Sequence, residues 1–310
     1  MSIVEAEIRG TWAGHDVRTS TLSELFPEDR QALGPYGVLR VGDAIHYFRR
    51  RYVEPFLRVV SEERRIAVFL DAGSGFGWFS LALVEVRPGA VVLAVDLQRS
   101  RLRILDKLSH LLGVRKRVWP VVADLEALPF RTGAFVATAC VEALEHVGEG
   151  EPRPIARRRQ RRALSELARV TRGWMLVATP NRWFPWVSHD VSLPLAHWLP
   201  FGLRRMYAGL FRRAHRLERV HLLSPAWVER ALGRPKVATA FLNFRNPDDW
   251  LSIFPLRVPY MPRPGSVLDR RGSLLARYGK LVHRLFGAGS RYFLHSLCVV
   301  YELNGRTLSK

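Results

Sequence analysis

Short apolar runs alternate along this chain with stretches in which apolar residues recur at helical spacing. The runs at 66–70 and 91–95 are continuous in Val, Leu, Ile, Ala and Phe, which is typical of strands buried in a parallel sheet. A helical pattern begins at Trp78, a few residues after the first run. This succession of strand and helix predicts an α/β fold.

A glycine-rich turn, DAGSGFG, joins the first predicted strand to that helix and runs from Asp71 to Gly77. Gly73, Gly75 and Gly77 let the backbone turn tightly and approach a ligand without a Cβ in the way. The helix that follows directs its unpaired amides toward the turn. A strand, a glycine turn and a helix together predict a site for a nucleotide-type cofactor.

The spacing of these glycines discriminates among nucleotide cofactors. A dinucleotide fingerprint would need glycine where Trp78 stands, and a phosphate-binding loop would end in Gly-Lys-Ser/Thr, which is absent. Asp71, at the mouth of the turn, would repel a pyrophosphate and favours a cationic ligand. We therefore expect a nucleoside that carries an amino acid and no phosphate.

Five segments in this order resemble the class I S-adenosylmethionine-dependent methyltransferases of the type 11 group, including the ubiquinone-biosynthesis O-methyltransferases. They are the acidic residue with its G-x-G-x-G, then VVLAVDLQRS, VVADLEALPF, FVATACVEALEHV and RALSELARVTRGWMLVATPN, and they span 66–181. One departure is Val136, where the family often has aspartate. The resemblance implies a Rossmann-like sheet of seven mostly parallel strands with helices on both faces, and S-adenosylmethionine as cofactor.

The resemblance also implies roles for individual residues. It assigns Asp96 to both ribose hydroxyls, Asp124 to the adenine amino group and Leu125 to packing on the adenine ring, although an aspartate that ends a strand is often only a helix cap. The full predicted cofactor set is Asp71, Gly73, Ser74, Gly75, Phe76, Gly77, Asp96, Leu97, Asp124, Leu125 and Cys140.

Catalysis of methyl transfer rests on alignment and on exclusion of water. A hydroxyl acceptor also needs a base, for which histidine is suited near neutral pH, whereas a carbon or nitrogen acceptor needs none. The predicted catalytic residue is His146, with His189 and His197 as further candidates. The alternative is that Glu145 and His146 only orient the loop after the fourth strand.

Residues 1–65 are predicted to form an N-terminal helical cap, and 66–310 the methyltransferase domain. Within 36–65 the apolar stripe comprises Ile45, Phe48, Tyr52, Phe56 and Val59. The stripe is interrupted by Arg49, Arg50 and Arg51. His46, Tyr47 and Arg50 are candidates for contacts with substrate or with the cofactor carboxylate. The alternative is a helix packed on the sheet edge with its arginines in solvent.

An insertion at 181–222, dense in Trp, Phe, Leu, Pro and Arg, is predicted to form a lid over the substrate pocket. Pro180 just before it and Pro185, Pro194 and Pro200 within it prevent one continuous helix through its first half. Beyond Phe201 an apolar side and a basic side separate at helical spacing, as in a segment that lies in a membrane interface. An apolar lid over the pocket of a soluble enzyme is the open alternative.

The remainder of the chain completes the predicted sheet. SPAWVERAL at 224–232 is expected to be a helix that begins after a serine cap. Residues 236–244 are expected to form a strand and 273–286 a helix. The apolar run 291–303 is expected to form the last strand, which is antiparallel in the fold that the resemblance implies.

Composition sets further limits. The 310 residues are 48% hydrophobic, enough for a packed core, and carry a net charge of +20 that is almost entirely arginine. The charge favours polyanions, either lipid head groups or nucleic acid. Cys140 and Cys298 have no metal-ligand spacing, and neither a signal peptide nor a membrane span is apparent. We expect a cytoplasmic protein, peripheral at the inner membrane face if the basic insertion binds lipid.

These observations predict a methyltransferase that acts by O- or C-methylation on a small hydrophobic or lipid-linked acceptor at an anionic membrane surface. One alternative is an RNA methyltransferase, which the charge favours. Against it, ACVE stands where many base-amino methylating enzymes have Asn/Asp-Pro-Pro-Tyr/Phe. A second alternative is a non-catalytic S-adenosylmethionine-binding protein. The sequence leaves the oligomeric state open.

Overall fold

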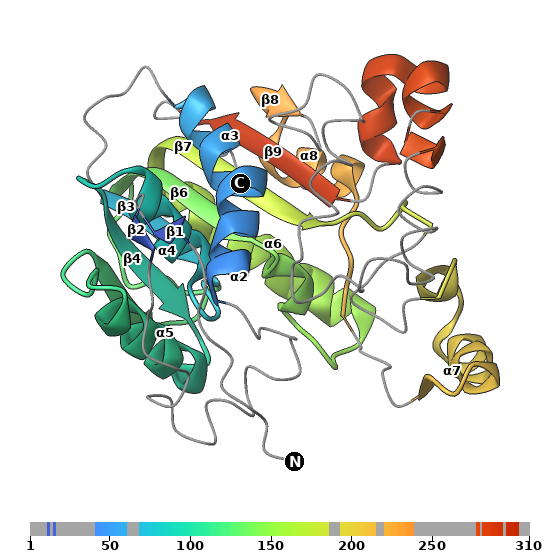
Figure 1. The fold of residues 1–310 in the computed structure, drawn as a ribbon. Coiled ribbons are helices and arrows are strands. Elements are labelled where there is room, and N and C mark those ends of the chain that lie inside the picture. Colours follow the sequence, from blue (N-terminus) through green and yellow to red (C-terminus); the bar gives the residue numbers. More distant parts are fainter. Residues whose placement is uncertain are drawn as a thin grey trace, which may run out of the picture. The chain divides into compact units, whose positions relative to one another are not determined.

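The computed structural model describes residues 11–12, 15–16, 41–60, 68–185, 193–214, 220–238, 277–279, 281–293 and 296–303 (Figure 1). The chain divides into two compact units, 1–122 with 241–281 and 123–240 with 282–310. The division predicted at residue 65 stays a prediction, as does the lid at 181–222.

The first unit contains a short antiparallel pair of strands, β1 (Thr11–Trp12) and β2 (His15–Asp16). The N-terminal helix follows as α2 (Val41–Phe48), the π-helical segment η3 (Arg49–Val53) and α3 (Glu54–Val59). It packs against α4, the helix that begins directly after the glycine turn. The predicted helix is therefore present, with a change of winding at the three arginines.

That change of winding shifts the buried face of the N-terminal helix. A π turn holds one residue more than an α turn, so the stripe moves on by one position. The core therefore includes Val53 and Val60, whereas Val59 of the predicted stripe is only half-buried. Arg51 is also buried, because its guanidinium lies over Tyr47 and Tyr52 and its Nε donates to the Tyr52 hydroxyl at 2.9 Å. The expectation that all these arginines face solvent is wrong for Arg51.

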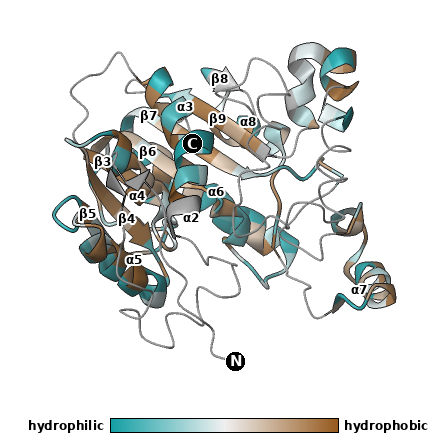
Figure 2. Ribbon diagram, viewed as in Figure 1, coloured by the Kyte–Doolittle hydropathy of each residue, from teal (hydrophilic) through white to brown (hydrophobic). Residues whose placement is uncertain are grey.

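Three parallel strands form the sheet of the first unit: β3 (Val68–Ala72), β4 (Val91–Asp96) and β5 (Val118–Val122). The brown colour of β3 and β4 in Figure 2 matches their continuous apolar sequence. The register pairs Ala72 with Val95, so the turn after β3 starts beside the end of β4. Helices α4 (Trp78–Val86) and α5 (Arg99–Leu111) follow the first two strands. This arrangement places the glycine turn and Asp96 at the same edge.

The sheet of the second unit contains a parallel pair and two antiparallel strands. Its strands are β6 (Phe135–Val141), β7 (Thr171–Pro180), β8 (Val237–Ala238) and β9 (Ser296–Glu302), of which β6 and β7 are parallel. As predicted, the last strand, β9, is antiparallel: it pairs with β7 on one side and with β8 on the other. The strand order β5-β4-β3-β6-β7-β9-β8 is that of a seven-stranded, mostly parallel Rossmann-like sheet. The predicted fold class is confirmed.

Helices of the second unit include α6 (Arg153–Val170), α7 (Phe201–Leu210) and α8 (Pro225–Leu232). Three short 3-10 segments accompany them: η4 (Leu144–His146), η5 (Ala196–Trp198) and η7 (Gly287–Tyr292). The last strand starts later than expected, at Ser296, since η7 occupies the start of the predicted range. Of the strand predicted at 236–244, residues 239–244 lie outside the described residues. Of the helix predicted at 273–286, residues 273–276 and 280 lie outside them, and the described residues are helical.

Candidate functional site

The glycine turn adopts a conformation that only glycine takes without strain. Gly73, Gly75 and Gly77 have φ values of 76°, 54° and 79°. Gly77 also caps α4, and a Cβ at this position would overlap the side chain of Leu105 on α5. The three glycines are therefore explained by backbone conformation and, at Gly77, by close helix packing.

The backbone amides of this turn bind acceptors within the protein. Gly73 and Ser74 both donate to the carbonyl of Val95, at 2.7 and 2.8 Å, and Gly77 donates to Ser74 at 2.8 Å. Gly75 donates to Oδ2 of Asp96 at 2.8 Å. A phosphate cradle would need such amides for its ligand. Their internal bonds agree with the expectation of a ligand without phosphate at this turn.

Asp96, at the end of β4, is held by two backbone amides. Its Oδ2 accepts from Gly75, and its Oδ1 accepts from Gln98 at 2.8 Å. Each carboxylate oxygen keeps a further lone pair for a ligand hydroxyl. The neighbouring Leu97 is 63% exposed, while Phe76 is buried beneath the Arg101 guanidinium, 5.7 Å from its ring centroid. The glycine turn and Asp96 thus lie side by side, and Arg101, which was not among the predicted residues, covers Phe76.

Asp71 lies inside the first unit and not at an open mouth of the turn. Its side chain is almost fully buried, and Oδ2 accepts a 2.6 Å hydrogen bond from the hydroxyl of Ser80 on α4. Burial raises the pKa of Asp71 to about 7; the Ser80 hydrogen bonds oppose this rise and the charge of Asp96 adds to it. The carboxylate is therefore partly protonated near neutral pH, and a cation beside it would favour its ionised form.

Asp124 and Leu125 belong to the second unit and follow β5 in the chain. Asp124 is half-buried and its Oδ1 accepts from the amide of Glu126 at 2.9 Å, so it does cap a local turn. Leu125 is buried. This pair lies at the start of a loop that continues to Phe130.

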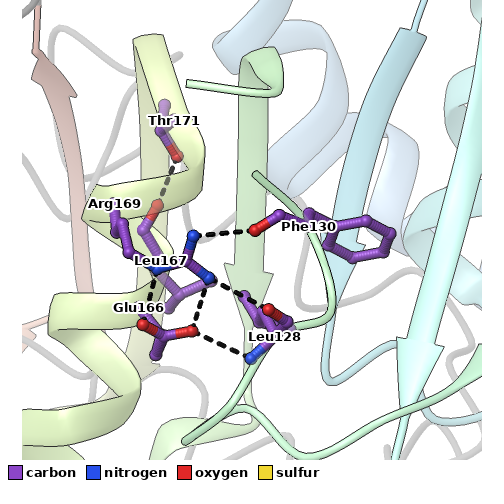
Figure 3. Close-up of polar contacts among 6 residues, drawn as sticks. All are labelled: Leu128, Phe130, Glu166, Leu167, Arg169 and Thr171. Atoms are coloured by element: carbon purple, nitrogen blue, oxygen red, sulfur yellow. Dashed lines mark hydrogen bonds and ion pairs between the residues drawn. The ribbon is translucent and has the colours of Figure 1, made fainter. Parts of the chain in front are cut away.

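The loop from Asp124 to Phe130 is fixed to α6 by the Glu166–Arg169 pair (Figure 3) and by an ion pair between Arg159 and Glu126. Arg169 donates to the carbonyls of Phe130 and Leu128 at 2.7 and 3.0 Å, and Glu166 accepts from the amide of Leu128 at 2.9 Å. The hydrogen bond from Arg169 lowers the pKa of Glu166. Sequence reasoning missed both residues, although their i, i+3 spacing on a helix was visible.

The end of β6 carries the predicted catalytic residue. His146 lies in η4, 36% exposed, and its Nδ1 is 2.9 Å from Oε2 of Glu149. Glu145 is buried and accepts from the hydroxyl of Thr179 at 2.9 Å, which is a supporting contact. Glu142 precedes them with a φ of 51°, a conformation uncommon for a non-glycine residue. Cys140 is fully buried in β6.

The other two candidate histidines differ in what is described of them. His197, on η5, lies 3.0 Å through Nε2 from the carbonyl of Arg182. His189 lies outside the described residues, as do parts of the predicted lid. His146 thus has a carboxylate at its ring, and His197 has a backbone carbonyl.

A cavity of about 730 Å³ lies in the second unit and was not predicted. Its lining is strongly basic on one side and aromatic on another. It consists of Gly150, Glu151, Pro152, Arg153, Arg157, Arg182, His197, Trp198, Leu199, Pro200, Phe201, Arg204, Val220, His221 and Leu222. The only sequence signal was the arginine density of 153–162, which does not reveal which side chains converge.

The chain was compared with known proteins. Residues 70–174 match a family model described as a methyltransferase domain. No curated protein matches the chain in sequence. Among the described residues, no helix is long and apolar enough to cross a bilayer.

Several solved methyltransferases resemble the chain in structure. A geranyl diphosphate methyltransferase in complex with GPP and sinefungin is 15% identical with a TM-score of 0.50, covering 81% of this chain and 76% of that chain. The geranyl diphosphate C-methyltransferase of Streptomyces coelicolor A3(2) is 16% identical with a TM-score of 0.47, covering 79% and 74%. A putative sarcosine dimethylglycine methyltransferase from Galdieria sulphuraria is 13% identical with a TM-score of 0.47, covering 82% and 84%.

The first of these structures supports the fold at this low identity, and the family model supports the domain. Both agree with the order of segments found in the sequence and with the strand order of the sheet. Residues 70–174 thus form a methyltransferase domain, for which S-adenosylmethionine is the implied cofactor, and the sheet has the Rossmann-like fold of the solved methyltransferase.

Proposed function

We propose that the chain transfers the methyl group of S-adenosylmethionine to a small hydrophobic or lipid-linked acceptor, by O- or C-methylation, at an anionic membrane surface. The observation that carries the cofactor half is the glycine turn. Its amides are bonded internally, and the carboxylates of Asp71 and Asp96 lie beside it. Such a turn suits a cationic nucleoside and opposes a phosphate.

The proposed cofactor residues are those that the resemblance assigns. In the first unit, Asp96 would accept the ribose hydroxyls through its remaining lone pairs, and Asp71 would favour the positively charged methionine part. In the second unit, Asp124 and Leu125 would contact the adenine. The full proposed set is Asp71, Gly73, Ser74, Gly75, Phe76, Gly77, Asp96, Leu97, Asp124, Leu125 and Cys140.

The acceptor half of the proposal rests on α7 and its surroundings. Leu203, Met206 and Leu210 are 52%, 69% and 81% exposed on this helix, and Phe211 directly after it is 55% exposed. Arginines at 204, 205, 212 and 213 accompany this apolar face. An exposed apolar face with a basic border is typical of helices that lie in a membrane interface.

For a hydroxyl acceptor we propose His146 as the base. Its Nδ1 contact with Glu149 would orient the ring and stabilise the imidazolium that forms when Nε2 takes a proton. The proton then passes to solvent, since His146 is partly exposed.

An RNA acceptor is the second candidate, and one observation favours it. Arg158, Arg161 and Arg162 are exposed along α6 and form a basic stripe that could follow a phosphate backbone. The exposed apolar residues of α7 are not explained by RNA, so the lipid-linked acceptor accounts for more of the surface.

Calorimetric titration with S-adenosylhomocysteine tests the cofactor half. Asp96→Ala and Gly75→Arg should abolish binding, because one removes the carboxylate and the other places a side chain at a positive φ. Gly89→Arg is the matched control, since space is open at Gly89 and its φ is ordinary. Normal affinity in both site variants would contradict the assigned site. Binding without methyl transfer to any acceptor class would favour the non-catalytic alternative.

A further inference from the structure

The cavity in the second unit gathers guanidinium groups from three separate segments. Arg153 and Arg157 come from the first turns of α6, Arg182 follows β7, and Arg204 belongs to α7. The cavity holds about 730 Å³, enough for a molecule of moderate size. Like charges repel, so such a convergence costs stability unless an anion offsets it.

Within the described part of the chain, three of these arginines have no carboxylate partner. Arg157 donates to the neutral side-chain oxygen of Gln160 at 2.9 Å and to the carbonyl of Leu222 at 2.7 Å. Neither Arg153 nor Arg182 forms an ion pair with a described residue. Glu151 is the one acidic residue in the lining. Its backbone carbonyl lies 3.0 Å from Nε2 of His221.

The mutual repulsion is reflected in the titration of the lining. Burial and then the charges of Arg153 and Arg182 lower the pKa of Arg157 to about 10. Burial, followed by the charge of Arg153, lowers the pKa of Arg182, and burial also lowers that of His221. The two arginine shifts show positive charges held in an unfavourable setting, which a bound anion would relieve.

The remaining wall is apolar and aromatic. Trp198 and Phe201 are 43% and 40% exposed, and the Arg204 guanidinium lies 5.4 Å from the Phe201 ring centroid. Leu199 and Val220 complete this side. Basic and aromatic groups thus line one cavity, as a ligand with an anionic head and an apolar body requires.

We infer that this cavity binds the phosphoryl group of an amphiphile, with Arg153, Arg157 and Arg182 around the phosphoryl oxygens and the apolar body against Trp198 and Phe201. Several guanidinium forks match a multiply charged oxyanion better than a single carboxylate. The phosphoryl group could belong to a lipid head group or to a phosphorylated soluble molecule.

Hydrogen bonds connect this cavity with the segment that carries His146. Gln160 donates to the carbonyls of Leu144 and His221 at 2.9 and 2.8 Å, and the His221 amide donates to Glu145 at 2.9 Å. The cavity wall and η4 are therefore held together within one unit. The idea that the bound amphiphile is the methyl acceptor rests on the proposed function. The binding of the amphiphile in this cavity does not depend on that function.

Calorimetry with octyl phosphate tests the inference, with octyl glucoside and inorganic phosphate as the probes that lack one half of the ligand. The site variant is Arg153→Gln with Arg182→Gln. The matched control is Arg161→Gln with Arg172→Gln, which removes the same charge at exposed positions outside the cavity. We expect the site variant to lose at least tenfold in affinity for octyl phosphate and the control less than twofold.

Octyl phosphate should also bind more tightly than either half-probe. Equal affinity for octyl glucoside, or equal losses in the two double variants, would overturn the inference. Vesicles of phosphatidylcholine with phosphatidic acid separate the sources: a loss confined to the site variant on vesicles and on octyl phosphate supports a lipid head group. A loss on octyl phosphate alone supports a soluble phosphorylated molecule.

Two further measurements, with RNA and with S-adenosylhomocysteine, separate the phosphoryl site from the proposed methyltransferase function. If the site variant loses affinity for a short RNA but not for octyl phosphate, the inference that the ligand is an amphiphile is wrong. S-adenosylhomocysteine binding is measured on the same samples and should be unchanged in both variants. Its absence from the unsubstituted protein would contradict the proposed function while leaving the phosphoryl result standing.

Discussion

The hydroxyl of Ser80 lies 2.6 Å from Oδ2 of Asp71, so that the third residue of α4 holds the carboxylate at the end of β3. This contact spans the glycine turn and closes it from the inside. It also places a carboxylate where burial opposes its ionisation. The protonation of Asp71 thereby becomes linked to cofactor binding and to folding.

Cofactor binding should depend on pH through Asp71. Its pKa is about 7 in the described state, and a cationic ligand favours the ionised carboxylate. The affinity for S-adenosylhomocysteine, whose amino group is positively charged, should therefore rise as pH increases from 6 to 8. Asp71→Asn should bind more weakly and lose this dependence. A pH profile unchanged by the substitution would contradict the link.

Folding stability should depend on Asp71 with the opposite sign. The pKa in the folded state is raised above its ordinary value, so folding favours the protonated group. The stability that this group contributes is present at acid pH and is lost as pH rises toward 7. Thermal unfolding without cofactor should show Asp71→Asn gaining relative to the unsubstituted protein between pH 5 and pH 8. A constant difference in Tm would argue against the buried charge.

Gly77→Ala should destabilise the protein by about 2–4 kcal/mol, because its φ is positive and the new Cβ overlaps Leu105. Gly89→Ala, where space is open, should change stability by less than about 1 kcal/mol. Urea denaturation measures both. Leu105→Ala relieves the overlap but leaves a cavity, so the Gly77→Ala/Leu105→Ala variant should lose less stability than the sum of the two single losses.

The Glu166–Arg169 pair should control the order of the loop that contains Asp124. Arg169→Met removes two hydrogen bonds to carbonyls of that loop and should cost about 1–3 kcal/mol. Hydrogen exchange should accelerate in 124–130, and S-adenosylhomocysteine affinity should fall. Arg172→Gln, on the exposed start of β7, is the control that should leave exchange in this loop unaltered.

Membrane binding should depend on the exposed side chains of α7. Met206→Gln with Leu210→Gln should reduce binding to vesicles that contain phosphatidylglycerol, and higher salt should reduce it further. Leu281→Gln with Leu285→Gln changes residues of similar exposure elsewhere and serves as control. Sedimentation with vesicles gives the bound fraction. Equal loss in the two pairs would remove α7 from the membrane proposal.

The sequence was sufficient to predict the strands, the glycine turn and the carboxylate at the end of β4, because each depends on local pattern. Short continuous apolar runs between turn residues are typical of buried strands, and repeated positive φ values in one turn favour glycine. The antiparallel last strand followed from the resemblance and is confirmed.

What the sequence could not predict depends on contacts between distant segments. Arg153 and Arg182 lie 29 positions apart and share a cavity only because β7 returns the chain past the start of α6. The burial of Asp71 depends on how Ser80 is presented by α4. Neither the shared cavity nor the Asp71–Ser80 contact produces a periodic pattern in the sequence.

The π-helical segment Arg49–Val53 has a consequence for how the N-terminal helix tolerates insertions and deletions. A π turn amounts to one residue inserted into an α-helix, so two helical wheels, out of phase by about 100°, describe 41–48 and 54–59. Removing one of the three arginines would merge the wheels into one α-helix and leave Val60 packed where it is, whereas α-helical winding through all three would present Val59 there. The number of residues in the arginine triplet, more than its charge, thus sets which side chains the following helix buries.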